Sequence, residues 1–121
     1  MSASGPIFRL FHNAEWRAFA QSGTFGGSAD DRRDGFIHMS TAEQAEGTRA
    51  KHYASVGDLV VAAFDASVLS DTIRWEPSRD GALFPHVYGI LTKAAFIGAS
   101  AVGFDGLEPA MARALTGERP A

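Results

Sequence analysis

The chain has 121 residues, of which 45% are hydrophobic, and a formal net charge of -3 at pH 7. This length predicts one domain over residues 1–121, with a core over about 6–105 and a C-terminal extension over 107–121. Because the chain has no cysteine, a disulfide scaffold, a thiolate nucleophile and a cysteine-ligated metal are excluded. The negative charge argues against nucleic acid as a partner.

No segment predicts membrane insertion. The longest apolar run, residues 59–64, is far shorter than the ~20 residues that a spanning helix needs. Residues 1–5 lack the charged and apolar regions of a signal peptide. We therefore expect a cytoplasmic protein that has no membrane partner.

The first part of the chain predicts a strand, a helix and a loop. Residues 6–11 alternate as a strand does, and Arg9 lies on the face of the odd-numbered side chains. Asn13 is a candidate N-cap for a helix of about ten residues that stops at Gly23. Residues 24–34 are rich in Gly, Ser and Asp without apolar periodicity, which predicts a loop.

A short strand and a second helix are expected next. Residues 35–39 alternate well enough for a strand that contains His38. Ser40 and Glu43 then have the spacing of a capping box, which opens a helix to about residue 53.

The second half of the chain predicts closely spaced strands and one more helix. The expected elements are strands over 59–64, 71–75, 86–91 and 94–104, a loop over 76–83, a helix over 107–116 and a frayed end after Gly117. The strands follow one another too closely for repeated βαβ units. The order predicts an α+β fold with a mixed or antiparallel sheet and two or three helices.

Two short segments carry the strongest chemical signal. Residues 35–41 and 84–89 each place a histidine, His38 or His86, among aromatic and apolar residues next to a hydroxyl side chain. Histidine can act as acid, base or ligand near neutral pH. With Glu76 between the two segments, the pattern predicts one polar pocket.

Three kinds of site fit these residues. Ser40 as a nucleophile lacks a G-x-S-x-G elbow and is better explained as a helix cap. His38, His86 and Glu76 match a two-histidine, one-carboxylate metal set without its usual spacings, and hydrogen bonds to carbonyls or carboxylates are the alternative. Ser40 at a helix N-terminus, with His38 and Arg9, would suit an anion. The remaining histidines, His12 and His52, are interpreted as structural.

The ordered motifs resemble a known family. They are Glu15-Trp16, residues 35–41 with Gln44, residues 59–65, Arg74-Trp75-Glu76 and residues 84–89. This series, which spans the chain to about residue 105, resembles an uncharacterised bacterial family, domain of unknown function 952. That family commonly ends soon after a Leu-Pro pair, whereas this chain continues.

The family is similar in fold to the ADP-ribosyltransferase superfamily, so the resemblance implies a split, bent β core with a cleft for NAD. It implies that Arg9 contacts the dinucleotide, that residues 38–41 support the nicotinamide ribose, and that Glu76 stabilises positive charge on that ribose. The predicted site then has His38 and Glu76 as catalytic residues and, as ligand-binding residues, Arg9, Ser40, Thr41, Arg74, His86 and Tyr88.

Three functions remain open from the sequence. The first is an NAD-consuming transferase, with NAD or another nucleotide-like small molecule as its ligand. The second is a non-catalytic module that binds such a ligand, and the third is a metal-dependent hydrolase. The prediction of a single pocket requires His38, Glu76 and His86 to meet at one cleft within about 8–10 Å, the reach of a small ligand pocket.

Overall fold

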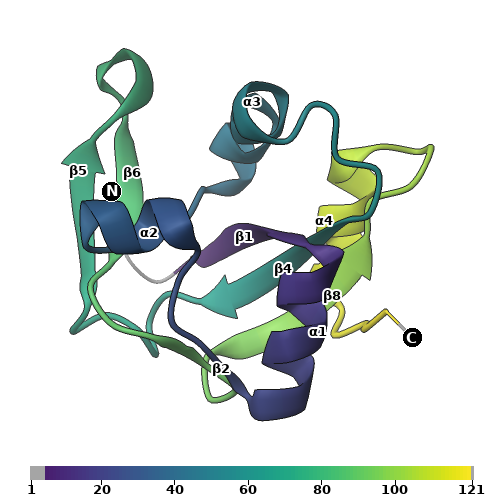
Figure 1. The fold of residues 1–121 in the computed structure, drawn as a ribbon, viewed down its shortest axis with the longest axis horizontal. Coiled ribbons are helices and arrows are strands. Elements are labelled where there is room, and N and C mark those ends of the chain that lie inside the picture. Colours follow the sequence, from purple (N-terminus) through teal and green to yellow (C-terminus); the bar gives the residue numbers. More distant parts are fainter. Residues whose placement is uncertain (1–4, 121) are drawn as a thin grey trace.

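A three-stranded antiparallel sheet lies at the centre of the computed structural model, which describes residues 5–120 apart from the side chain of Arg79 (Figure 1). Its strands, in spatial order, are β1 (Pro6–His12), β4 (Leu59–Asp65) and β8 (Phe96–Ala101). The apolar alternation predicted for β1 is confirmed, because its side chains divide between two separate buried clusters.

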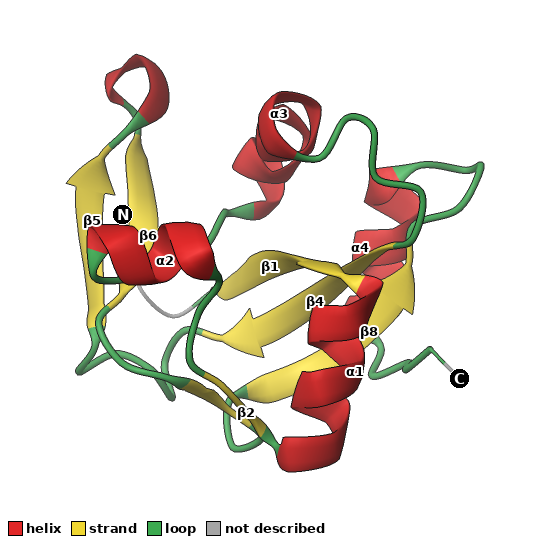
Figure 2. Ribbon diagram, viewed as in Figure 1, coloured by secondary structure: helices red, strands yellow, loops and turns green. Residues whose placement is uncertain are grey.

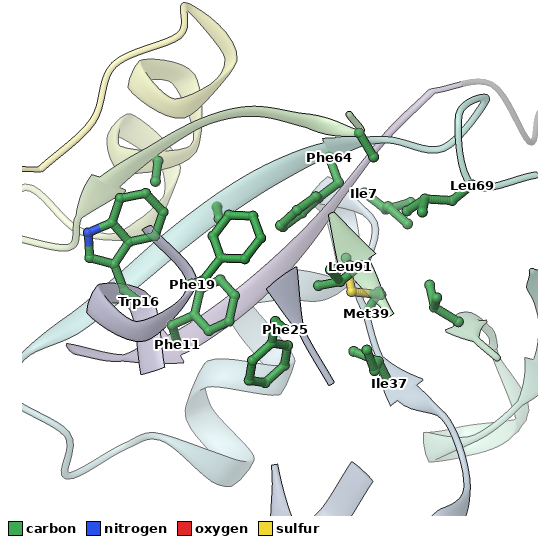
Figure 3. Close-up of a cluster of buried hydrophobic side chains, with 14 of the residues drawn as sticks. Ile7, Phe11, Trp16, Phe19, Phe25, Ile37, Met39, Phe64, Leu69 and Leu91 are labelled. Carbon is green, nitrogen blue, oxygen red and sulfur yellow. The ribbon is translucent and has the colours of Figure 1, made fainter. Parts of the chain in front are cut away.

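Helices cover both faces of this sheet (Figure 2). On one face, α1 (Asn13–Ser22) supplies Trp16 and Phe19 to an aromatic cluster that includes Phe11 and Phe64 (Figure 3). On the other face, α3 (Ala42–His52) and α4 (Leu107–Leu115) pack on the alternate side chains of β1 and β4. Each strand of this sheet is thus held between two layers.

A second three-stranded antiparallel sheet has the order β3–β6–β5, with β3 (Ile37–His38), β6 (Leu83–Val87) and β5 (Ile73–Pro77). Its link to the first sheet is Ser40, whose backbone exchanges hydrogen bonds of 2.9 and 2.7 Å with Phe8 on β1. A two-stranded ribbon joins β2 (Thr24–Phe25) to β7 (Leu91–Thr92). The α+β class with antiparallel pairing is confirmed.

The loop predicted over 24–34 is wrong, because this segment forms β2 and a short helix, α2 (Ala29–Asp34). The helix has no apolar stripe to reveal it. Its signal is the capping box in which Asp31 N donates to Ser28 Oγ at 3.2 Å and Ser28 N donates to the Asp31 carboxylate at 2.7 Å. Gly27, with φ of +113°, lets the chain pass where a Cβ would lie 2.9 Å from Asp31 Cβ. With α2, the described chain has four α-helices rather than two or three.

Two predicted helix starts are wrong by one residue. The N-cap of α1 is His12 rather than Asn13, and its backbone N–H donates to Glu15 Oε1. The box that opens α3 is formed by Thr41 and Gln44 rather than by Ser40 and Glu43. Asn13 is the first residue of α1, and Ser40 is held by its backbone bridge to Phe8, so neither residue caps the helix as expected.

The strands of the second sheet are also displaced from their predicted bounds. β5 runs on to Pro77, so Glu76 lies in a strand instead of a loop, and a single 3-10 turn, η1 (Arg79–Gly81), precedes β6. The strand expected over 86–91 ends at Val87. Proline is tolerated in β5 because this is an edge strand of the sheet.

The C-terminal residues are not frayed as predicted. Ala99 N donates to Glu118 O at 2.7 Å, and the Arg119 guanidinium lies 4.9 Å from the centre of the Phe96 ring. This packing requires glycine at position 98, where a Cβ would lie 2.2 Å from Ala114 O.

Candidate functional site

A cleft of about 500 Å³ opens where β1, α2, α3 and β6 meet. In Figure 1, α2 lies to the left of β1 and α3 lies above it. All four histidines of the chain line this cleft, namely His12, His38, His52 and His86. The prediction of purely structural roles for His12 and His52 therefore did not anticipate their place in the lining.

A buried ion pair forms one wall of the cleft. Arg9 Nη1 lies 2.9 Å from Asp31 Oδ2, and the two side chains are 4% and 2% exposed. The same nitrogen donates to His38 O at 3.0 Å. Asp31 thereby ties α2 to β1 and β3, which explains why a helix of only six residues keeps its place.

The Asp31 carboxylate is strongly held in its charged form. Burial raises its pKa, but this effect is outweighed by hydrogen bonds from the His38 ring and from two backbone N–H groups, and by the charge of Arg9. The pKa of Asp31 is therefore well below its usual range. At neutral pH this carboxylate is an acceptor only.

His38 lies between two carboxylates of α2. Its Nδ1 is 2.7 Å from Asp31 Oδ1, and its Nε2 is 3.0 Å from Asp34 Oδ2. Asp34 is also held by Arg33, whose hydrogen bond is the main cause of the lowered Asp34 pKa. Both ring nitrogens of His38 are thus engaged, in a side chain that is 38% exposed.

His86 has a different environment. Its Nδ1 is 2.7 Å from Glu76 Oε1, which also accepts a hydrogen bond of 2.8 Å from Tyr88 Oη. The imidazole stacks on Phe36 with ring centroids 3.9 Å apart and an interplanar angle of 18°. With 6% of its side chain exposed, His86 is a buried residue of the lining.

The three residues expected to meet at one cleft do so in part. The rings of His38 and His86 lie 5.8 Å apart, centroid to centroid, on neighbouring strands. Glu76 contacts His86 and is absent from the lining, so it reaches the cleft only through that imidazole. Among the described residues no group of three or more histidine or acidic side chains is arranged to hold a metal ion.

The hydrogen bonds of the Arg9 side chain do not use all of its N–H groups. Its Nη1 makes all of the side-chain hydrogen bonds that Arg9 forms within residues 5–120, and its buried Nε has no partner. The guanidinium lies 5.1 Å from the centre of the Phe25 ring, which is a cation–π contact.

Of the other predicted site residues, Ser40 belongs to the lining of the cleft, whereas Thr41, Arg74 and Tyr88 do not. Ser40 lines the cleft, but its Oγ bonds to Thr48 Oγ1 at 2.9 Å and its amide to Phe8, so it offers no free helix amide. Thr41 caps α3. Outside the cleft lining, the Arg74 guanidinium lies 5.3 Å from the centre of the Tyr88 ring.

Four residues near the site were missed from the sequence. They are Asp31, Asp34, Phe36 and Lys51. The spacing from Ser28 to Asp31 is a capping box that would have revealed α2 and, with it, both aspartates. Phe36 lies within the segment 35–41 that the sequence singled out, but its stacking on His86 follows only from the pairing of β3 with β6. Lys51 carries no local signal, because its place follows from the orientation of α3.

Comparison with known proteins identifies the family. Residues 10–99 match the family described as "Protein of unknown function (DUF952)", so the chain belongs to it. The predicted family is therefore confirmed. No curated protein matches the chain.

Two solved structures of one protein are similar to this chain. The crystal structure of protein CC0527 from Caulobacter crescentus has a TM-score of 0.77 and 39% identity, and the match covers 85% of this chain and 92% of that one. For its solution NMR structure the TM-score is 0.71 and the identity 40%, with 84% and 89% covered. Within residues 5–120, no helix has the length and apolar character needed to cross a membrane.

Proposed function

We propose that the cleft binds a small anionic ligand of the nucleotide type, with NAD as the first candidate. The observation that carries the proposal is the lining, in which four histidines, Arg9 and Lys51 share one cleft of about 500 Å³. Small-molecule sites typically have about 300–1,000 Å³. NAD enters through the resemblance to the ADP-ribosyltransferase superfamily.

The charges of the lining support an anion. The three aspartates that line the cleft are already paired, Asp30 with Arg33, Asp31 with Arg9 and His38, and Asp34 with His38 and Arg33. The remaining carboxylate of the lining, Glu15, accepts a hydrogen bond from His12 N. Lys51 takes part in none of the ion pairs within residues 5–120. An incoming phosphate would thus meet the ammonium of Lys51, which no ion pair compensates, whereas the unpartnered Nε of Arg9 is sealed from the cleft.

Binding is better supported than transfer. Transfer of ADP-ribose needs a carboxylate near the ribose, where positive charge develops as nicotinamide leaves. The resemblance assigns this role to Glu76, which lies behind His86 and outside the lining. We therefore propose ligand binding as the function. Transfer by Glu76 and His38 is tested in the same experiment through the release of nicotinamide.

Calorimetric titration with NAD and with AMP tests the proposal, and released nicotinamide is measured in the NAD samples. We expect saturable binding that weakens about tenfold in Lys51→Ala, since a charge-assisted hydrogen bond is lost. Lys93→Ala, the other lysine of the chain and not part of the lining, is the matched control and should bind as wild type does.

Each result decides between the functions. Binding without nicotinamide release supports the non-catalytic module. Release that stops in Glu76→Gln supports the transferase. If neither nucleotide binds in a saturable way, the proposed function is wrong.

A further inference from the structure

The hydrogen bond between His86 and Glu76 has a fixed direction. Glu76 Oε1 lies 2.7 Å from His86 Nδ1 and also accepts the hydroxyl of Tyr88. The hydrogen bonds from His86 and Tyr88 lower the pKa of Glu76, against a smaller opposing effect of burial. Because an ionised carboxylate can only accept, the proton of this bond belongs to His86 Nδ1.

This direction determines what the other ring nitrogen offers. When Nδ1 of a neutral imidazole carries the proton, Nε2 is a bare acceptor. Stacking on Phe36 at 3.9 Å restrains the ring from turning. The edge that carries Nδ1 faces Glu76, which is not part of the lining, so His86 presents the Nε2 edge to the cleft.

Nε2 is also unused. His86 makes no hydrogen bond through Nε2 within residues 5–120, and the sealed side-chain polar atoms without a partner in that range are Arg9 Nε and Trp75 Nε1. Nε2 is therefore open to the cleft, although the side chain as a whole is 6% exposed. In His38, by contrast, both nitrogens are occupied by aspartates.

We infer that His86 Nε2 accepts a hydrogen bond from a hydroxyl group of the ligand, so that the cleft selects sugar-bearing anions, with a ribonucleotide preferred to its dideoxy form. The inference rests on the proposed function and adds the substrate class. Arg9 and Lys51 bring only donors, which suit a phosphate. A bare imidazole nitrogen repels a phosphate oxygen and accepts from a hydroxyl, so the sugar lies at the β6 end of the cleft.

The wild-type protein alone tests the premise that His86 carries its proton on Nδ1 and leaves Nε2 unprotonated. Nitrogen-15 NMR at pH 7.5 distinguishes the two neutral tautomers of a histidine from its cation. We expect His86 with a protonated Nδ1 and an unprotonated Nε2. A proton on Nε2, in the other tautomer or in the cation, would overturn the inference before any ligand is added.

Titration with AMP and 2′,3′-dideoxy-AMP tests the inferred hydrogen bond between a sugar hydroxyl and His86 Nε2. The wild type should bind AMP about 5–10-fold more tightly, the value of one neutral hydrogen bond. In His86→Asn the amide nitrogen keeps the bond to Glu76 but nothing replaces Nε2, so the preference should disappear. Lys93→Ala is the control, because Lys93 lies outside the lining of the cleft, and it should keep the preference.

The outcomes separate the two proposals. If neither nucleotide binds, the proposed function and the inference both fail. If both bind equally to the wild type, or if His86→Asn keeps the preference, only the inference fails. Thermal unfolding shows whether His86→Asn is folded; if it is not, the tautomer and the preference of the wild type decide.

Discussion

His38 and His86 are cross-strand neighbours, yet they are held in opposite ways. Both nitrogens of His38 contact aspartates of α2, and its side chain is 38% exposed. His86 uses one nitrogen on Glu76 and is buried against Phe36. The comparison indicates that His38 fastens α2 to the second sheet, whereas His86 forms its side-chain hydrogen bond through one nitrogen only.

The largest effect should come from replacing Asp31, the buried carboxylate that contacts both His38 and Arg9. In Asp31→Asn the Arg9 guanidinium stays buried without its counter-charge. Removing one partner of a buried ion pair costs about 3–5 kcal/mol of the free energy of unfolding. Urea denaturation measures this loss.

Asp30→Asn on the same helix is the control. Asp30 pairs with Arg33 at 3.1 Å, and both side chains are more than 60% exposed. Such surface pairs contribute about 0–1 kcal/mol. If the two variants lose the same stability, the Arg9–Asp31 pair does not hold α2.

The pH dependence of stability should follow from the same carboxylate. Because the pKa of Asp31 is lower in the folded protein than its usual 3.8, the folded state binds fewer protons in acid. Its contribution is therefore complete above pH 3.8 and is lost as the pH falls below that value. The difference in unfolding free energy between wild type and Asp31→Asn should shrink over this range. A difference that stays constant to pH 2.5 would contradict the assignment.

The sequence predicted the first sheet better than the second. Strands β1 and β4 and helix α4 follow from alternation, apolar runs and helical spacing, all of which are local signals. The second sheet depends on pairing between distant segments, and β3 has only two residues. Its bounds are set by long-range hydrogen bonds that no local pattern contains.

The site was predicted in outline for a related reason. The motifs pointed to His38 and His86, and the structure brings their rings to 5.8 Å. Their partners were harder to identify, because Asp31 lies in a polar stretch without periodicity and Glu76 was expected in a loop. A capping box identifies a helix start, but only the folded chain shows what that helix carries to the cleft.

Phe36 contacts both histidines, and its replacement should affect them to different degrees. Its ring centroid lies 3.9 Å from that of His86 and 4.6 Å from that of His38. In Phe36→Leu we expect a loss of about 1 kcal/mol from the lost aromatic contacts. The ring-proton shifts of His86 should change more than those of His38, because only His86 is stacked. Phe104→Leu, fully exposed, is the control and should unfold as wild type does.

The smallest effect should come from the outer carboxylate of His38. Asp34→Asn removes the charge opposite Nε2 and part of the contact with Arg33, but the amide oxygen can still accept a hydrogen bond. Because Arg33 is exposed and Asp34 is 32% exposed, we expect a loss of no more than about 1 kcal/mol in urea denaturation. The loss should be at most a third of that in Asp31→Asn. Equal losses would mean that both nitrogens of His38 fasten α2, and that the buried bond to Asp31 is not the dominant one.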